Sequence, residues 1–242
     1  MAVGVTPSIL AAPLRWTAMS EVVRVKHCGI TSLADAELCV GAGAWALGLN
    51  FWRESKRHVR IGEAMEIGAA MKRRVELAGV FVNAPLDDVA QTADQVGLTM
   101  IQLHGDEGPA YADEVARRTG AQIIKATRVG DEGDVRALGP FQRADYHLLD
   151  TRIDGLPGGT GETFDWRLAL RHRGGVPLIL AGGLTPDNVA DAIETVRPFA
   201  VDVAGGTEAS PGVKDAARVT AFMEAVASTA TPEEVLHESA DA

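Results

Sequence analysis

Two groups that could transfer protons stand where predicted β-strands end. Cys28 ends the β-branched, partly apolar run 22–28 and is followed directly by Gly29. A cysteine is usually a small core residue, but a thiol between a strand and a glycine turn is placed for chemistry. Asp150 follows the run 146–149 and precedes a glycine-rich stretch rather than a helix that it could cap. Both residue types serve in acid–base catalysis, although placement alone does not say which is the acid.

Glycine clusters follow three later predicted strands, and such clusters suit an anion. Glycine lets the backbone approach a ligand closely, and N–H groups at a helix N-terminus then bind the anion. In (β/α)8 barrels, the loops after the seventh and eighth strands form a phosphate site. We therefore expect a phosphorylated small molecule as the ligand. The candidate glycines are Gly159 and Gly161 after the sixth strand, Gly182 and Gly183 after the seventh, and Gly205 and Gly206 after the eighth.

The elements that must position these groups alternate along the chain as eight strand–helix units. Each predicted strand is a short run of β-branched and aliphatic residues, and helical patterns separate the strands. Alternation alone also allows an open doubly wound sheet, but such folds place their glycines after an early strand. The late glycines favour one (β/α)8 TIM barrel of the α/β class, over residues 21–230. The predicted strands are 22–28, 44–50, 75–82, 99–103, 121–126, 146–149, 177–180 and 199–203.

Two terminal segments fall outside this pattern. Residues 1–20 contain an apolar patch, but their one charge, Arg15, follows the patch, whereas a signal peptide carries its positive charge first. We expect a disordered leader, or an upstream start codon with Met19 as the functional one. The acidic residues 231–242 are expected to be a frayed tail.

Composition excludes several classes of function. The net charge of −10 argues against nucleic-acid and membrane-surface binding, because both need a basic face. No apolar run approaches the length of a membrane helix. Cys28 and Cys39 form neither a disulfide framework nor a zinc motif, which suits the cytoplasm. Cys39, among apolar helix residues, is expected in the core. The histidines outside the strand ends show no metal-ligand spacing, so we expect no metal.

Seven collinear motifs between residues 22 and 226 resemble the phosphoribosylanthranilate isomerases of tryptophan biosynthesis. Each motif is modest alone, but their number and order make the resemblance specific. They are K-x-CGIT (26–31), QLHG (102–105), LLDT (148–151), GGTG with FDW (158–166), LAGGL with P-x-N (180–188), RPFAVDV (197–203) and SPGVKD (210–215).

The resemblance implies a (β/α)8 enzyme that uses neither metal nor cofactor. Its reaction would be the Amadori rearrangement of N-(5-phosphoribosyl)anthranilate, an aldose–ketose isomerisation. By resemblance, Cys28 is the general base that removes the C2′ proton, and Asp150 is the general acid that protonates the ring oxygen. Arg57 aligns with the arginine that binds the anthranilate carboxylate, and its planar fork suits that group. We expect a monomer or a homodimer.

Other polar residues on or next to the predicted strands carry expectations of their own. His104 ends the fourth predicted strand and either contacts substrate or makes a structural hydrogen bond. Lys26 and Asp202 occupy strand positions that could face the barrel interior, where an unpaired charge would be costly, so we expect them to pair. His27 replaces a usually aliphatic residue, and strand alternation predicts that it points to the helix layer unless it turns toward Cys28.

Two further departures from the family pattern leave rival functions open. Glu54 adds a negative charge where an anionic substrate would approach, and Ala204 removes a serine hydroxyl from the expected phosphate loop. One rival is the sister sugar-phosphate isomerase of histidine biosynthesis, although that enzyme uses an aspartate base where Cys28 stands. The other is a paralogue that binds a phosphorylated ligand without turnover.

Overall fold

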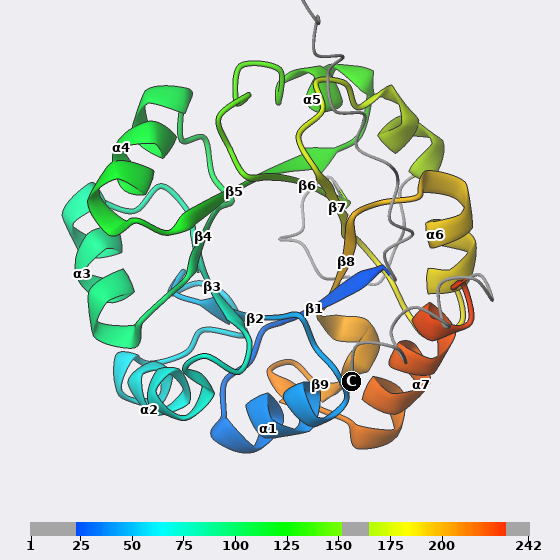
Figure 1. Ribbon diagram of the computed structural model, residues 1–242, viewed down its shortest axis with the longest axis horizontal. Helices are drawn as coiled ribbons and strands as arrows, with labels where there is room; N and C mark the ends of the chain where they lie inside the picture. The colour runs from blue at the N-terminus through cyan, green and yellow to red at the C-terminus, as the bar shows by residue number, and fades with distance from the viewer. Residues whose placement is uncertain (1–22, 152–164, 231–242) are drawn as a thin grey trace, which may run out of the picture.

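The computed structural model describes residues 23–151 and 165–230 as a closed barrel of eight parallel strands. Viewed down the barrel in Figure 1, the strands form an inner ring and the helices lie outside it. Each strand pairs with its neighbours in sequence, and β1 (Arg24–Cys28) closes the ring against β8 (Ala200–Val203). The predicted fold class is therefore confirmed. The leader, the acidic tail, Gly159 and Gly161 lie outside the described residues.

The barrel elements follow one another in strict alternation. The remaining barrel strands are β2 (Ala46–Asn50), β3 (Glu76–Phe81), β4 (Met100–Leu103), β5 (Gln122–Val129), β6 (Tyr146–Thr151) and β7 (Leu178–Leu180). The α-helices are α1 (Leu33–Gly41), α2 (Ile61–Met71), α3 (Leu86–Val96), α4 (Pro109–Thr119), α5 (Glu132–Arg136), α6 (Val189–Val196) and α7 (Ala216–Ala227). Two 3-10 helices, η1 (Trp166–Arg171) and η2 (Gly205–Thr207), and a hairpin of β9 (Glu208–Ser210) with β10 (Val213–Lys214) complete them.

The barrel interior is filled rather than hollow. Alternate strand residues point inward and form a core cluster of Ala78, Met100, Ile124, Ala126, Leu148, Ile179, Ala181 and Ala200. Three aromatic rings pack beside this cluster at the starts of the strands. The ring centroid of Trp45 lies 5.5 Å from those of both Tyr146 and Phe199, and those two lie 5.2 Å apart. These rings pack at the N-terminal end of the barrel, opposite the end at which (β/α)8 barrels bind their ligands.

The last third of the chain differs from the predicted elements. The sequence pattern predicts a helix from Asp165; the structure has the 3-10 helix η1 there, which Asp165 caps by accepting a hydrogen bond from the Arg167 amide. The pattern also predicts a last helix over residues 213–228, but α7 begins only at Ala216, since Asp215 is its N-cap. Before it, the chain reverses through Gly212, whose φ of 82° favours glycine, and forms the unpredicted β9–β10 hairpin.

Candidate active site

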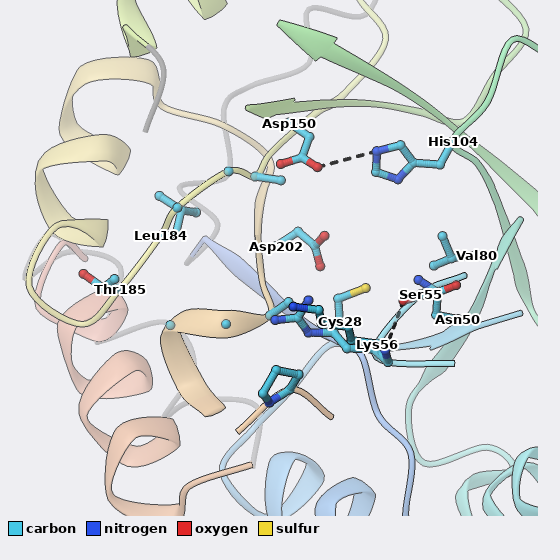
Figure 2. A pocket seen from close by; sticks show the side chains of 18 of the residues that line it. Cys28, Asn50, Ser55, Lys56, Val80, His104, Asp150, Leu184, Thr185 and Asp202 are labelled. Atoms are coloured by element: carbon cyan, nitrogen blue, oxygen red, sulfur yellow. Dashed lines mark hydrogen bonds and ion pairs between the residues drawn. The ribbon is translucent and has the colours of Figure 1, made fainter. Parts of the chain in front are cut away.

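A cavity of about 950 Å³ opens at the C-terminal ends of the barrel strands. Figure 2 shows Cys28, Asp150 and Asp202 with their side chains directed into it. β1 and β6 are separated by β7 and β8 in the ring, so Cys28 and Asp150 lie on different walls. A single small molecule in the cavity could therefore contact both groups from different sides. This is the end of a (β/α)8 barrel at which active sites lie.

Cys28 stands over a buried ion pair. Lys26, two residues earlier on β1, is fully buried, and its Nζ lies 2.8 Å from Asp202 Oδ1 on β8. The predicted pairing of these two residues is thus confirmed. A Cβ at Gly48 on β2 would lie 2.7 Å from Cys28 Sγ and 3.1 Å from Lys26 Nζ. Only glycine leaves room at this position for the thiol and the ammonium to share one corner of the cavity.

The charges around Cys28 oppose the effect of burial. Burial raises the pKa of the Cys28 thiol above its usual value, whereas the cation of Lys26 acts to lower it and the Asp202 carboxylate to raise it. For Lys26, burial disfavours the ammonium, yet Asp202 and Cys28 together raise its pKa. Lys26 therefore stays charged, and it supplies a fixed positive charge where a Cys28 thiolate would form.

Asp150 is flanked by a polar pair from β4. His104 Nε2 lies 3.5 Å from Asp150 Oδ2, and the Nε2 amide of buried Gln102 donates to His104 Nδ1 at 2.9 Å. In this amide orientation Nδ1 accepts, so the ring proton lies on Nε2 and faces the Asp150 carboxylate (Figure 2). His104 thus lines the cavity and makes a structural hydrogen bond with Gln102, while its contact with substrate stays a prediction.

Arg57 lines the cavity but is held by an acidic partner that the sequence did not indicate. Its Nε and Nη2 donate to both carboxylate oxygens of Glu208, at 2.7 to 3.0 Å. This hydrogen-bonded pairing raises the pKa of the guanidinium further, so Arg57 is cationic. The Arg57 stem crosses the Gly29 turn so closely that a Cβ there would clash with it, and Gly29 has a φ of 78°. The edge formed by Nη1 and Nη2 is the one that a second carboxylate can reach.

The candidate anion loops meet at one side of the cavity. Gly182 and Gly183 follow β7 with φ values of 89° and 65°, a conformation that favours glycine, and Gly205 and Gly206 begin η2 after β8. A Cβ at Gly206 would lie 3.0 Å from Thr185 Cα and closer still to the backbone of the β7 loop, so the two loops are in contact. All four glycines line the cavity, where their backbone amides can bind an anion.

The three departures from the family pattern lie in different places. His27 is fully buried on the outer face of β1, with its ring centroid 6.1 Å from that of Phe222 on α7, so it points away from Cys28 as alternation predicts. Burial lowers the pKa of His27 to about 3, which keeps the ring neutral. Glu54 and Ala204 both line the cavity. Cys39, as expected, is a buried core residue of α1.

Sequence reasoning missed the roles of two buried charges in the β9–β10 hairpin. Glu208 binds Arg57, and Lys214 donates hydrogen bonds to the Cys28 and Ala204 carbonyl oxygens at 2.9 and 3.1 Å. Lys214 lies in the SPGVKD motif, which supports the family resemblance but does not by itself indicate a role for the lysine. The one local signal was a lysine and a glutamate six residues apart around a glycine turn.

Within residues 23–151 and 165–230, no cluster of three or more metal-ligating side chains occurs. In the same part of the chain, no helix combines the length and the apolar character needed to cross a membrane.

The family model described as N-(5'phosphoribosyl)anthranilate (PRA) isomerase matches residues 25–225. The chain belongs to this family. The N-(5'-phosphoribosyl)anthranilate isomerase of Geobacter sulfurreducens is 50% identical over 204 residues, covering 84% of this chain and 97% of that protein. That of Rubrobacter xylanophilus is 45% identical over 207 residues, covering 86% and 100%.

Solved structures of the phosphoribosylanthranilate isomerase family share the fold. The enzyme of Thermotoga maritima aligns with a TM-score of 0.77 at 41% identity, covering 85% of this chain and 99% of that one. A second structure, described as a complex with reduced 1-(o-carboxyphenylamino)-1-deoxyribulose 5-phosphate, aligns with a TM-score of 0.74 at 40% identity over the same shares. That relative binds an anionic, phosphorylated molecule related to the expected product.

Proposed function

We propose that this chain isomerises N-(5-phosphoribosyl)anthranilate to 1-(2-carboxyphenylamino)-1-deoxyribulose 5-phosphate in tryptophan biosynthesis. The observation that carries the proposal is that Cys28 and Asp150 enter one cavity from different walls, in a chain of this family. The glycine loops after β7 and β8 would bind the phosphate, and Arg57 would bind the anthranilate carboxylate. A substrate with an anion at each end suits a cavity with these two anchors.

The reaction needs an acid and a base in turn. Asp150 in its protonated form gives its proton to the ribose ring oxygen; the bond between this oxygen and C1′ breaks, and a C1′=N bond forms. The Cys28 thiolate then removes the C2′ proton, which leaves an enolamine. Transfer of the 2′-hydroxyl proton to C1′ completes the ketone. The cation of Lys26 stabilises the thiolate, which burial alone would disfavour.

His104 would help to orient the acid. Its Nε2–H faces the Asp150 carboxylate, and Gln102 fixes the ring from the other side. At 3.5 Å the ring is close enough to hold the Asp150 carboxyl group in place. His104 would thus act on the orientation of the acid rather than on the substrate.

Turnover is the direct test. Purified protein should consume phosphoribosylanthranilate in a fluorescence assay without added metal or cofactor, with kcat in the ordinary range of about 1–10³ s⁻¹. Absence of turnover with retained affinity for the reduced product analogue would favour a non-catalytic binding protein instead. Turnover of the histidine-pathway aminoimidazole in place of phosphoribosylanthranilate would favour the sister isomerase.

Two further proposals concern the cellular location and the oligomeric state of the protein. We propose a cytoplasmic protein, in keeping with its two free cysteines. A structure from Thermotoga maritima is described as monomers of a dimeric enzyme, and we propose a monomer or a homodimer for this chain as well.

A further inference from the structure

The β9–β10 hairpin joins η2 to α7 beside the end of β1. Its two strands are antiparallel, and Lys214 stands opposite Glu208 in the register. Both side chains are buried, although the hairpin itself lies outside the barrel wall (Figure 1). Glu208 Oε1 lies 3.7 Å from Lys214 Nζ, so each charge partly neutralises the other. A hairpin of five strand residues thus carries a buried acid and a buried base.

Glu208 fixes the direction of the Arg57 guanidinium. Three hydrogen bonds of 2.7 to 3.0 Å join one edge of the guanidinium to both carboxylate oxygens. Arginine loses considerable side-chain freedom when it is ordered, and a bidentate pair meets that cost before a ligand arrives. The partner residues are 151 positions apart, so the hairpin brings Glu208 to a loop on the far side of β1.

Lys214 connects two parts of the cavity wall. Its ammonium has three donors, and all three are used: by the Cys28 carbonyl oxygen at 2.9 Å, and by the Ala204 carbonyl oxygen and Thr207 Oγ1 at 3.1 Å each. One buried cation therefore ties the end of the strand that carries the thiol to η2, which begins at Gly205.

A hairpin that only linked β8 to α7 would not need buried charges. Apolar side chains of similar volume would fix its place at equal or lower cost, because burying an ion pair carries a large desolvation penalty. Here each charge ends on a group of the candidate active site, which indicates a functional reason for retaining them.

We propose that the β9–β10 hairpin is a positioning element for the reaction: Glu208 directs Arg57 toward the substrate carboxylate, and Lys214 locks the Cys28 end of β1 to the phosphate loop. The identity of the substrate in this proposal rests on the proposed function, whereas the contacts of Glu208 and Lys214 do not depend on it. Neither residue need contact the substrate, so both are positioning residues.

The first experiment is a double-mutant cycle on kcat and KM. Glu208→Gln keeps the shape of the side chain and removes its charge, and it should raise KM about tenfold with kcat changed less than about threefold. In the Arg57→Ala background, Glu208→Gln should have almost no further effect, because its target is gone. Glu114→Gln is the control, since it removes the charge of an exposed carboxylate paired with Arg117 and Arg118.

The cycle separates positioning from mere stability. A KM penalty of equal size with and without Arg57 would overturn the role of Glu208, because it would then act independently of the guanidinium. Thermal melts of each variant establish that the compared proteins are folded. The control should leave both kcat and KM unchanged.

The second experiment follows Cys28 itself and does not need turnover. The charges of Lys26 on β1, Asp202 on β8 and Lys214 on β10 act on its thiol, and the charge of Arg57 in the loop after β2 interacts with it as well. Alkylation of the Cys28 peptide by iodoacetamide is measured against pH by mass spectrometry. Lys214→Gln removes one cation, so its profile should shift to higher pH, and kcat should fall about tenfold or more.

A milder variant guards against misfolding. Thr207→Val removes one acceptor of Lys214 but leaves its charge, and it should lower kcat in the same direction by a smaller factor. A folded Lys214→Gln or Thr207→Val with the wild-type alkylation profile and kcat would overturn the role of Lys214. Wild-type protein without turnover would refute the proposed function alone, since the alkylation profiles still test the hairpin.

Discussion

Lys26 Nζ lies 2.8 Å from Asp202 Oδ1 inside the barrel, directly beneath the thiol of Cys28. The pair costs desolvation energy, and an apolar pair would fill the same space. What an apolar pair would not provide is a positive charge next to the thiol. Asp202 and Cys28 together raise the pKa of Lys26, while the charge of Asp202 limits how far the thiolate is stabilised.

The two partners should shift the thiol pKa in opposite directions. Lys26→Met removes the cation and should move the Cys28 alkylation profile to higher pH; Asp202→Asn removes the anion and should move it to lower pH. Measurement of iodoacetamide reaction rates against pH gives both shifts. Shifts of the same sign in the two variants would contradict this electrostatic account and point to altered packing.

Removal of either proton-transfer group should lower turnover and leave folding largely intact. Cys28→Ser and Asp150→Asn should each reduce kcat by at least about 10²-fold, because a positioned acid or base contributes roughly that factor. Steady-state fluorescence kinetics measure kcat, and thermal melts check the fold. Cys39→Ser is the control thiol, since Cys39 lies in the helix layer. A wild-type rate in either catalytic variant would refute its role.

Gly48 should tolerate no side chain. In Gly48→Ala the added Cβ would lie 2.7 Å from Cys28 Sγ and 3.0 Å from Cys28 Cα, so the thiol must move. We expect kcat to fall by about tenfold or more, since displacement of a catalytic group by about 1 Å can cost 10²-fold. Gly62→Ala is the matched control, because nothing lies within 4 Å of its added Cβ. Equal kinetics for the two variants would show that Gly48 is not needed for placement of the thiol.

His27 should make the protein sensitive to acid. Burial lowers its pKa from about 6.5 to about 3, so between these values the unfolded chain binds a proton that the folded chain does not. Stability from the neutral ring is therefore complete above about pH 6.5 and falls as pH decreases, by up to about 1.4 kcal/mol per pH unit.

Chemical denaturation at several pH values measures that slope. His27→Ile restores the aliphatic residue usual at this position, removes the two buried ring nitrogens that have no partner, and should flatten the dependence between pH 6.5 and 4. An unchanged slope in His27→Ile would assign the acid sensitivity to other groups, such as the buried His147.

The parts of the site that lie at strand ends could be predicted from the sequence. Strand periodicity placed Cys28 and Asp150 at one rim, and the same alternation placed Lys26 and Asp202 inside and His27 outside. Because a buried charge needs a partner, the interior placement of Lys26 and Asp202 also predicted their ion pair. The regular spacing of residues along the strands thus predicted which side chains lie at the rim, inside the barrel and outside it.

The hairpin could not be predicted in this way. β9 and β10 have three and two residues, too few to show a period, and their exposed and buried positions do not alternate cleanly. The partner of Arg57 lies 151 residues away in β9, and neither strand register nor propensity relates the two residues. Arg57 was therefore predicted as a ligand-binding residue without the carboxylate that holds it.

The packed rings of Trp45, Tyr146 and Phe199 occupy the N-terminal end of the barrel. The cavity that holds Cys28 and Asp150 lies at the opposite end, where the strands terminate. Substrate and product of the proposed reaction would then share that opening, and bound product would compete with the next substrate molecule. Product release would thus be a step that can limit the overall rate.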